Sequence, residues 1–84
     1  MYRLSIKRSA ERDLRRLPRP LFVRINQHIL ALRSEPRPTG VRKLKGNTTG
    51  WRIRIEDYRI VYQIDDMAET VTIVRVKHRR EVYR

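Results

Sequence analysis

The sequence predicts an α+β domain in which two N-terminal helices pack on one face of a twisted, mainly antiparallel sheet. Apolar residues recur at helical spacing within residues 10–32, whereas apolar and polar residues alternate along much of residues 50–76. Prolines, glycines and acidic pairs separate these stretches. The expected element order is therefore β-α-α-β-β-β-β, and a chain of 84 residues suits one such domain, residues 1–84, with one modest core.

A short strand and a first helix are expected at the start of the chain. Residues 2–6 alternate between apolar and polar side chains, which is typical of a strand. Ser9 is placed to cap the following helix, and Pro18 is placed to end it. The apolar side of this helix consists of Ala10, Leu14 and Leu17. Its other sides carry the charged residues Glu11, Arg12, Asp13, Arg15 and Arg16.

A second helix is expected to begin near Pro20, which suits a first turn, and to end before Pro36. Its apolar stripe consists of Leu21, Ile25, Ile29 and Leu32, with Phe22 and Leu30 widening it. Only residues 17–20 connect the two helices, so they should run antiparallel on the sheet.

Residues 51–62 form two alternating runs separated by Glu56 and Asp57, which predicts a β-hairpin with these two residues as its loop. In this register Arg54 faces Arg59, and Arg52 shares their face of the sheet. The opposite face is apolar and consists of Trp51, Ile53, Ile55, Tyr58, Ile60 and Tyr62. Like charges directly across a sheet repel each other, so the pattern indicates a phosphate-binding surface, with a solvated arginine-rich face as the simpler alternative.

The hairpin is expected to lie between an edge segment and a final strand. Before it, residues 35–40 form a stiff connector, residues 41–46 a short basic strand or edge segment, and residues 47–50 a turn. After it come a strand to residue 64, an acidic turn at 65–69, a β-branched strand at 70–76, and a basic tail or single helical turn at 77–84. If the final strand pairs beside residues 58–64, Arg75, Lys77 and Arg79 complete a basic bowl.

Charge is the strongest global signal of the sequence. The chain has 21 basic and 9 acidic residues, a formal net charge of +12, which favours a nucleic-acid partner. Residues 1–49 hold 13 basic and 3 acidic groups, so most non-specific attraction comes from the first half. There is no cysteine and there are two histidines, so neither a disulfide nor a metal site is expected. The sequence shows no membrane span or signal peptide, so a cytoplasmic location is the default.

Arginine suits phosphodiester binding because its planar fork of donors keeps its charge, but the same property prevents it from acting as a base. An RNA-cleaving site that uses the 2′-hydroxyl as nucleophile needs a proton acceptor, positive charge at the phosphorane and a proton for the 5′-oxygen. Tyr83 and His78 are the nearby proton-transfer candidates, and each has a structural alternative: a C-terminal aromatic plug and a strand-end histidine. Asp65, Asp66 and Glu69 are expected to be solvated turn residues.

Residues 50–62, together with residues 76–84, resemble the RelE/ParE superfamily of bacterial and archaeal toxins, and in particular its RelE branch. The pattern His78-Arg79-Arg80-Glu81-Val82-Tyr83 carries most of this resemblance, which extends over nearly the whole chain and includes Leu44-Lys45-Gly46. It implies a ribosome-dependent endoribonuclease that cuts mRNA in the decoding site, uses no metal or cofactor, and is neutralised by an antitoxin, here expected to be acidic.

The resemblance also implies the site residues. Arg52 and Arg54 fall where the family has basic residues on the third strand, Arg59 matches an arginine of the next strand, and Arg79 and Tyr83 match the C-terminal arginine and tyrosine. The expected catalytic set is Arg52, Arg54, Arg59, Arg79, Tyr83 and His78. Further contacts with RNA are expected from Lys43, Lys45, Arg75, Lys77 and Arg80.

One departure narrows the chemistry. The best-studied family pattern has lysines at the positions of Arg52 and Arg54, and a lysine of lowered pKa can serve as a base. With arginines there, the base is Tyr83, His78 or water. Two other functions stay open at this point: a ParE-like toxin that inhibits DNA gyrase without cleaving RNA, and a basic RNA-binding module without catalysis.

Overall fold

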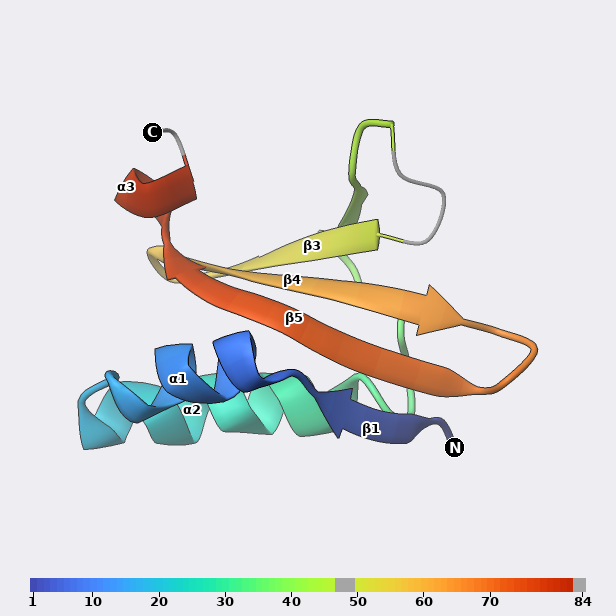
Figure 1. Ribbon diagram of the computed structural model, residues 1–84, viewed down its shortest axis with the longest axis horizontal. Coiled ribbons are helices and arrows are strands. Elements are labelled where there is room, and N and C mark those ends of the chain that lie inside the picture. The colour runs from blue at the N-terminus through green and yellow to red at the C-terminus, as the bar shows by residue number, and fades with distance from the viewer. Residues whose placement is uncertain (47–49, 83–84) are drawn as a thin grey trace.

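The computed structural model describes residues 1–46 and 50–82, and its helices and strands follow the expected order (Figure 1). The elements are β1 (Arg3–Ile6), α1 (Arg8–Arg15), α2 (Arg19–Ala31), β2 (Arg42–Lys43), β3 (Gly50–Ile55), β4 (Tyr58–Asp65), β5 (Thr70–His78) and the short helix α3 (Arg79–Val82). The strands form one sheet in the order β1-β5-β4-β3-β2. Only β1 and β5 are parallel, so the prediction of a mainly antiparallel α+β sheet is confirmed.

Helices α1 and α2 cover one face of the sheet, as Figure 1 shows, and α3 lies on the other side of it. The core between the helices and the sheet includes Ile25 and Ile29 from α2 and Ile60, Tyr62 and Ile73 from the strands, all fully buried. The stripe predicted for α2 is therefore correct except at Leu30, which is 48% exposed. Leu30 follows Ile29 directly, and a helix turns about 100° per residue, so with Ile29 fully buried Leu30 lies at the border of the stripe.

The hairpin has the register that the sequence predicts. Arg54 pairs with Arg59, Ile53 with Ile60, and Trp51 with Tyr62. Glu56 has a positive φ of 54°, as a two-residue hairpin loop requires at its first position. Tyr62 is a core residue: burial raises its pKa to about 12, and its hydroxyl donates to the Pro36 carbonyl at 2.7 Å. The turn predicted at residues 47–50 falls mainly on 47–49, which lie outside the described residues, and Gly50 begins β3.

Helix α1 completes an edge of the sheet that β1 leaves open. Strand β1 pairs only with Thr70 to Ile73 of β5, and α1 lies along the rest of that strand. The sequence predicted Ser9 as the N-cap of α1, and this prediction is wrong. The Ser9 hydroxyl donates instead to the Val74 carbonyl at 2.7 Å, and the N-cap residue is Lys7, without a side-chain cap. The Ser9 hydroxyl binds the edge of β5 because an open strand edge leaves backbone groups without partners, and the Val74 carbonyl is one of them.

Asp13 is the main correction to the predicted helix surface. It was expected on the polar side of α1, but it is only 8% exposed and faces β5. Its Oδ2 accepts hydrogen bonds from the Val76 backbone N–H at 2.9 Å and from Arg75 Nε at 2.9 Å. Arg75 Nη2 donates to Oδ1 at 3.1 Å. Asp13 thus supplies the hydrogen-bond acceptor that a neighbouring strand would otherwise offer to the Val76 N–H of β5.

Candidate nucleic-acid interface

The sheet face opposite α1 and α2 carries two rows of basic side chains, called here the arginine face. The first row crosses three strands and holds Arg54, Arg59 and Lys77. The second row crosses four strands and holds Arg42, Arg52, Val61 and Arg75. Residues paired across a sheet share a face, so the pairing alone brings these six cations together.

A hollow of about 340 Å³ opens in this face. Its lining consists of Gly40, Arg42, Arg52, Arg54 and Arg59. Arg59 forms the floor, since it is only 8% exposed, whereas Arg42 and Arg54 are exposed at the rim. None of the described residues that line the hollow is acidic. A group of like charges in one depression is unfavourable by itself, so the hollow is suited to an anion that bridges the guanidinium groups.

Several of the described carboxylates pair with basic residues outside the hollow. Within residues 1–46 and 50–82, the ion pairs include Arg15–Glu11, Arg24–Glu56, Arg37–Asp66 and Arg75–Asp13. By contrast, Arg42, Arg52 and Arg54 form no ion pair with any acidic residue in the described part of the chain. The acidic turn behaves partly as expected: Asp65 and Glu69 are exposed, but Asp66 also accepts a hydrogen bond from the Tyr2 hydroxyl at 2.7 Å.

Arg75 differs from the other arginines of the face because its guanidinium turns to the sheet edge and binds Asp13. Burial of Asp13 raises its pKa, but the hydrogen bonds from Arg75 and the Val76 N–H, with the charges of Arg75 and Lys77, outweigh this effect and lower the pKa below its ordinary value. Asp13 is therefore ionised at neutral pH, and it compensates the charge of Arg75. Contact of Arg75 with RNA stays a prediction.

The C-terminal segment approaches the first row of the arginine face. The Arg79 backbone N–H donates to the Asp57 carbonyl at 2.7 Å, which ties the start of α3 to the β3–β4 loop. Arg79 and Arg80 are both exposed. Tyr83 lies outside the described residues, so its predicted role has no structural description.

His78 lies on the wrong face for contact with the first row. It pairs with Tyr58, and the two rings meet edge to face with centroids 5.2 Å apart. Its Nδ1 accepts a hydrogen bond from the Arg80 backbone N–H at 3.2 Å. Arg59 and Lys77 point to the opposite side from their chain neighbours, so these contacts favour the structural alternative for His78 at the end of β5.

Lys43 and Lys45 also differ from the arginines. Lys43 pairs with Trp51, not with an arginine, and its Nζ lies 5.9 Å from the centroid of the Trp51 ring. Lys45 is exposed beyond the end of β2. The residue that β2 does bring to the hollow is Arg42, which sequence reasoning missed. Alternation within residues 41–46 places Arg42 and Lys43 on opposite faces of the strand. Only the pairing of β2 with β3 shows that Arg42 is the one on the arginine face.

Within 1–46 and 50–82, no group of three or more His, Cys, Asp or Glu side chains is placed to hold a metal ion. In the same residues no helix is both long enough and apolar enough to cross a membrane.

Comparison with known proteins agrees with this architecture. Residues 4–83 match the family model described as ParE toxin of type II toxin-antitoxin system, parDE. Among named proteins, the chain is 34% identical to Toxin RelG of Mycobacterium tuberculosis, covering 99% of this chain and 97% of that protein. It is 33% identical to Toxin RelE of the same organism, covering 99% of this chain and 87% of that protein.

Solved structures show the same fold. The crystal structure of the toxin–antitoxin complex RelBE2 from Mycobacterium tuberculosis contains a chain that is 30% identical, with a TM-score of 0.81 and coverage of 92% of this chain and 96% of that one. The archaeal RelE–RelB complex from Pyrococcus horikoshii contains one that is 29% identical, with a TM-score of 0.82 and coverage of 93% and 94%. The chain therefore belongs to the RelE/ParE superfamily of toxins of type II toxin–antitoxin systems.

Proposed function

We propose that this toxin is a metal-independent endoribonuclease that cleaves mRNA on the ribosome, in the cytoplasm, and that a cognate acidic antitoxin neutralises it. The observation that carries the proposal is the hollow of the arginine face, where four arginines converge and the described lining residues include no carboxylate. A buried or half-buried guanidinium in such a site offers preorganised charge for a phosphate whose negative charge grows during the reaction.

The reaction is an in-line displacement at phosphorus. The 2′-oxygen attacks the neighbouring phosphate, its proton passes to a base, and the bond from phosphorus to the 5′-oxygen breaks. The products are a 2′,3′-cyclic phosphate and a 5′-hydroxyl, which receives a proton. Arg54 and Arg59 face each other across β3 and β4, so both can contact the same phosphorane oxygens. Arg79 is the candidate for a third cation, because α3 is attached to the loop that joins these strands.

We assign the base to Tyr83, and water takes this role if neither Tyr83→Phe nor His78→Gln slows cleavage. Arginine cannot take the proton, and His78 faces away from Arg59 while its Nδ1 is already an acceptor for the Arg80 N–H. A cluster of arginines would lower the pKa of a nearby phenol and favour the phenolate. Tyr83→Phe should therefore slow single-turnover cleavage on programmed ribosomes by at least about 100-fold, with unchanged binding. His78→Gln is the matched control, and a dead His78→Gln beside an active Tyr83→Phe would reverse the assignment.

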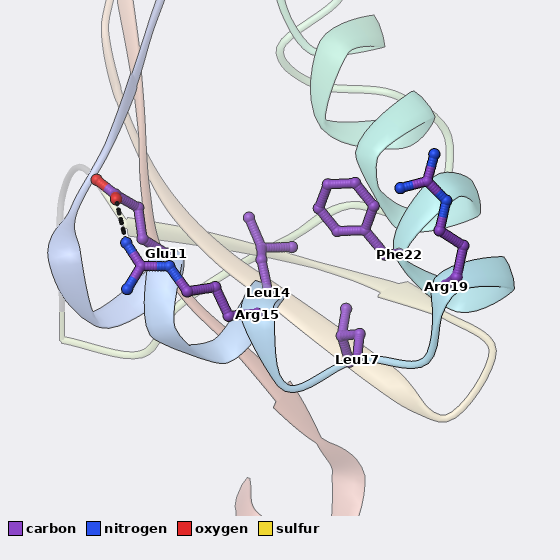
Figure 2. A pocket seen from close by; sticks show the side chains of 6 residues that line it. All are labelled: Glu11, Leu14, Arg15, Leu17, Arg19 and Phe22. Carbon is purple, nitrogen blue, oxygen red and sulfur yellow. Dashed lines mark hydrogen bonds and ion pairs between the residues drawn. The ribbon is translucent and has the colours of Figure 1, made fainter.

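A groove between the two helices supports the proposed antitoxin contact. Its volume is about 380 Å³, and its lining consists of Glu11, Leu14, Arg15, Leu17, Arg19 and Phe22. Figure 2 shows Leu14, Leu17 and Phe22 grouped between α1 and α2, with Arg19 on one side and the Arg15–Glu11 ion pair on the other. An apolar floor beside cations fits an amphipathic acidic helix. Since apolar burial persists in salt, the complex should remain intact at about 0.5 M salt, where RNA binding is weak.

The test of the proposed function is cleavage of mRNA on purified ribosomes by the purified toxin, with mapped 2′,3′-cyclic phosphate ends. A ParE-like toxin would leave the mRNA intact and would inhibit DNA supercoiling by gyrase. A simple RNA-binding module would do neither. Uncleaved mRNA under conditions where the toxin binds ribosomes would contradict the nuclease proposal.

A further inference from the structure

We propose that Arg42 and Arg52 form a second phosphate subsite, which binds the RNA phosphate next to the one held by Arg54 and Arg59. This inference rests on the proposed function, since it assigns the orientation of the same substrate across the arginine face. It gives Arg42, on the edge strand β2, a positioning role in substrate binding.

The first argument is the pairing of the strands. Arg42 pairs directly with Arg52, and both line the hollow beside Arg54 and Arg59. Arg52 and Arg54 are two residues apart on β3, so their rows are separated by about 7 Å along the strand. This separation is comparable with the distance between successive phosphates of an extended single strand. Each pair of arginines can therefore hold one of two consecutive phosphates.

The second argument is the difference in charge within the second row. Arg75 lies in the same row, but Val61 separates it from Arg52, and its guanidinium binds Asp13. Arg42 and Arg52 have no such ion pair with a described carboxylate. Gly40 borders the hollow beside them and adds no side chain to it. The uncompensated charge of the second row is thus concentrated at the β2–β3 end.

The third argument is that the row of the arginine face beyond the second basic row is uncharged. The next row of the same face, further from α3, consists of Gly50, Gln63, Thr72 and Ser5, and none of these carries a charge. Two basic rows followed by a neutral row define a short footprint on the sheet. We therefore expect the sheet to neutralise two consecutive phosphates of single-stranded RNA.

The main experiment uses mRNAs that carry one neutral methylphosphonate linkage directly before or directly after the scissile phosphate. With wild-type toxin and programmed ribosomes, one of the two should raise the toxin concentration for half-maximal single-turnover cleavage about tenfold, since a charged hydrogen bond is lost. Arg42→Gln should raise it about tenfold on unmodified mRNA and remove most of the difference between the modified and unmodified mRNAs. The maximal rate should change little. Arg16→Gln, on the helix side of the molecule, is the control for loss of one exposed charge.

Two outcomes would overturn the subsite: Arg42→Gln behaving like Arg16→Gln, or the neutral linkage weakening wild type and Arg42→Gln by the same factor. A wild-type toxin that cleaves nothing contradicts the proposed function instead, and the subsite is then tested by binding alone. Anisotropy of a labelled single-stranded oligoribonucleotide in increasing salt should give Arg42→Gln a slope smaller by about 0.7 than that of Arg16→Gln. Equal slopes would also overturn the inference. Arg42 is exposed on an edge strand, so a thermal melt should show that the variant folds normally.

Discussion

Arg52 and Arg75 occupy the same row of the sheet, separated only by Val61, yet their surroundings are opposite. Arg75 binds a carboxylate that is almost fully buried and completes the edge of β5. Arg52 lines a hollow in which the other charged residues among those described are all arginines. The comparison shows that position in the sheet does not decide the role of a basic residue. The nearby carboxylate does, because it determines whether the charge is available to a ligand.

The same distinction exists within the helix side. Arg15 and Arg24 have carboxylate partners at the surface, whereas Arg12 and Arg16 form no ion pair with a described carboxylate. On the arginine face, the described carboxylates leave Arg42, Arg52 and Arg54 uncompensated. A net charge of +12 on a chain with 9 acidic residues therefore acts through its distribution as well as its size.

The largest effect is expected at the first row of the arginine face. Arg54→Gln and Arg59→Gln should each slow single-turnover cleavage by about 100-fold, because each removes a charge that stabilises the transition state. Arg24→Gln is the matched control, since it removes an exposed arginine that already binds Glu56. Thermal melts should separate catalysis from stability, particularly for Arg59, which is buried. Near wild-type rates in both variants would remove the catalytic assignment.

The ion pair between Arg75 and Asp13 should contribute to the free energy of unfolding. Asp13→Asn leaves Arg75 without its anionic partner and weakens the contact with the Val76 N–H. We expect the free energy of unfolding to fall by about 3 kcal/mol, the lower end of the cost of breaking a buried charged pair, because Asp13 is buried and Arg75 is only partly so. The control on the same helix is Glu11→Gln, which breaks an exposed pair and should change stability by less than about 0.5 kcal/mol. Urea unfolding measures both, and similar values would contradict the structural role of Asp13.

A smaller effect is expected from pH. The pKa of Asp13 is lower in the folded protein than in the unfolded chain, so ionised Asp13 stabilises the fold above its unfolded pKa of about 3.9. This contribution should decrease as the pH falls through the folded pKa. The difference in unfolding free energy between wild type and Asp13→Asn should therefore be constant from pH 7 to about 5 and shrink below about pH 4. If the difference instead grows on acidification, the pKa of Asp13 is higher in the folded protein than in the unfolded chain, which contradicts the prediction.

The sequence predicted the fold and the arginine pair well because local rules determine them. A two-residue loop fixes the hairpin register, so Arg54 and Arg59 could be paired without a structure. Periodicity likewise identified α2 and most of its buried stripe. These features depend on residues that are close in sequence, where turn chemistry and spacing are visible.

Apart from Leu30, whose exposure follows from local helix geometry, the failures involve register or contact over long separations. Asp13 lies 63 residues before Val76, and nothing local shows that β1 leaves that part of β5 uncovered. Arg42 required the register across the connection between β2 and β3. For His78, the predicted strand ended at residue 76, whereas β5 continues to His78, and alternation turns that side chain to the Tyr58 side.

The smallest effect, and the most direct test of the opening comparison, is the salt dependence of RNA binding. Arg52→Gln should reduce the slope of log K against log salt by about 0.7, because one contact with a single-strand phosphate is lost. Arg75→Gln should leave the slope unchanged at a temperature where the variant is folded, because Asp13 already compensates Arg75. Both substitutions remove one formal charge from the same row, so long-range electrostatics affect them alike, and the difference in slope reports direct contact. If both substitutions reduce the slope by the same amount, Arg75 leaves Asp13 to bind RNA, and the carboxylate does not determine which arginines contact the substrate.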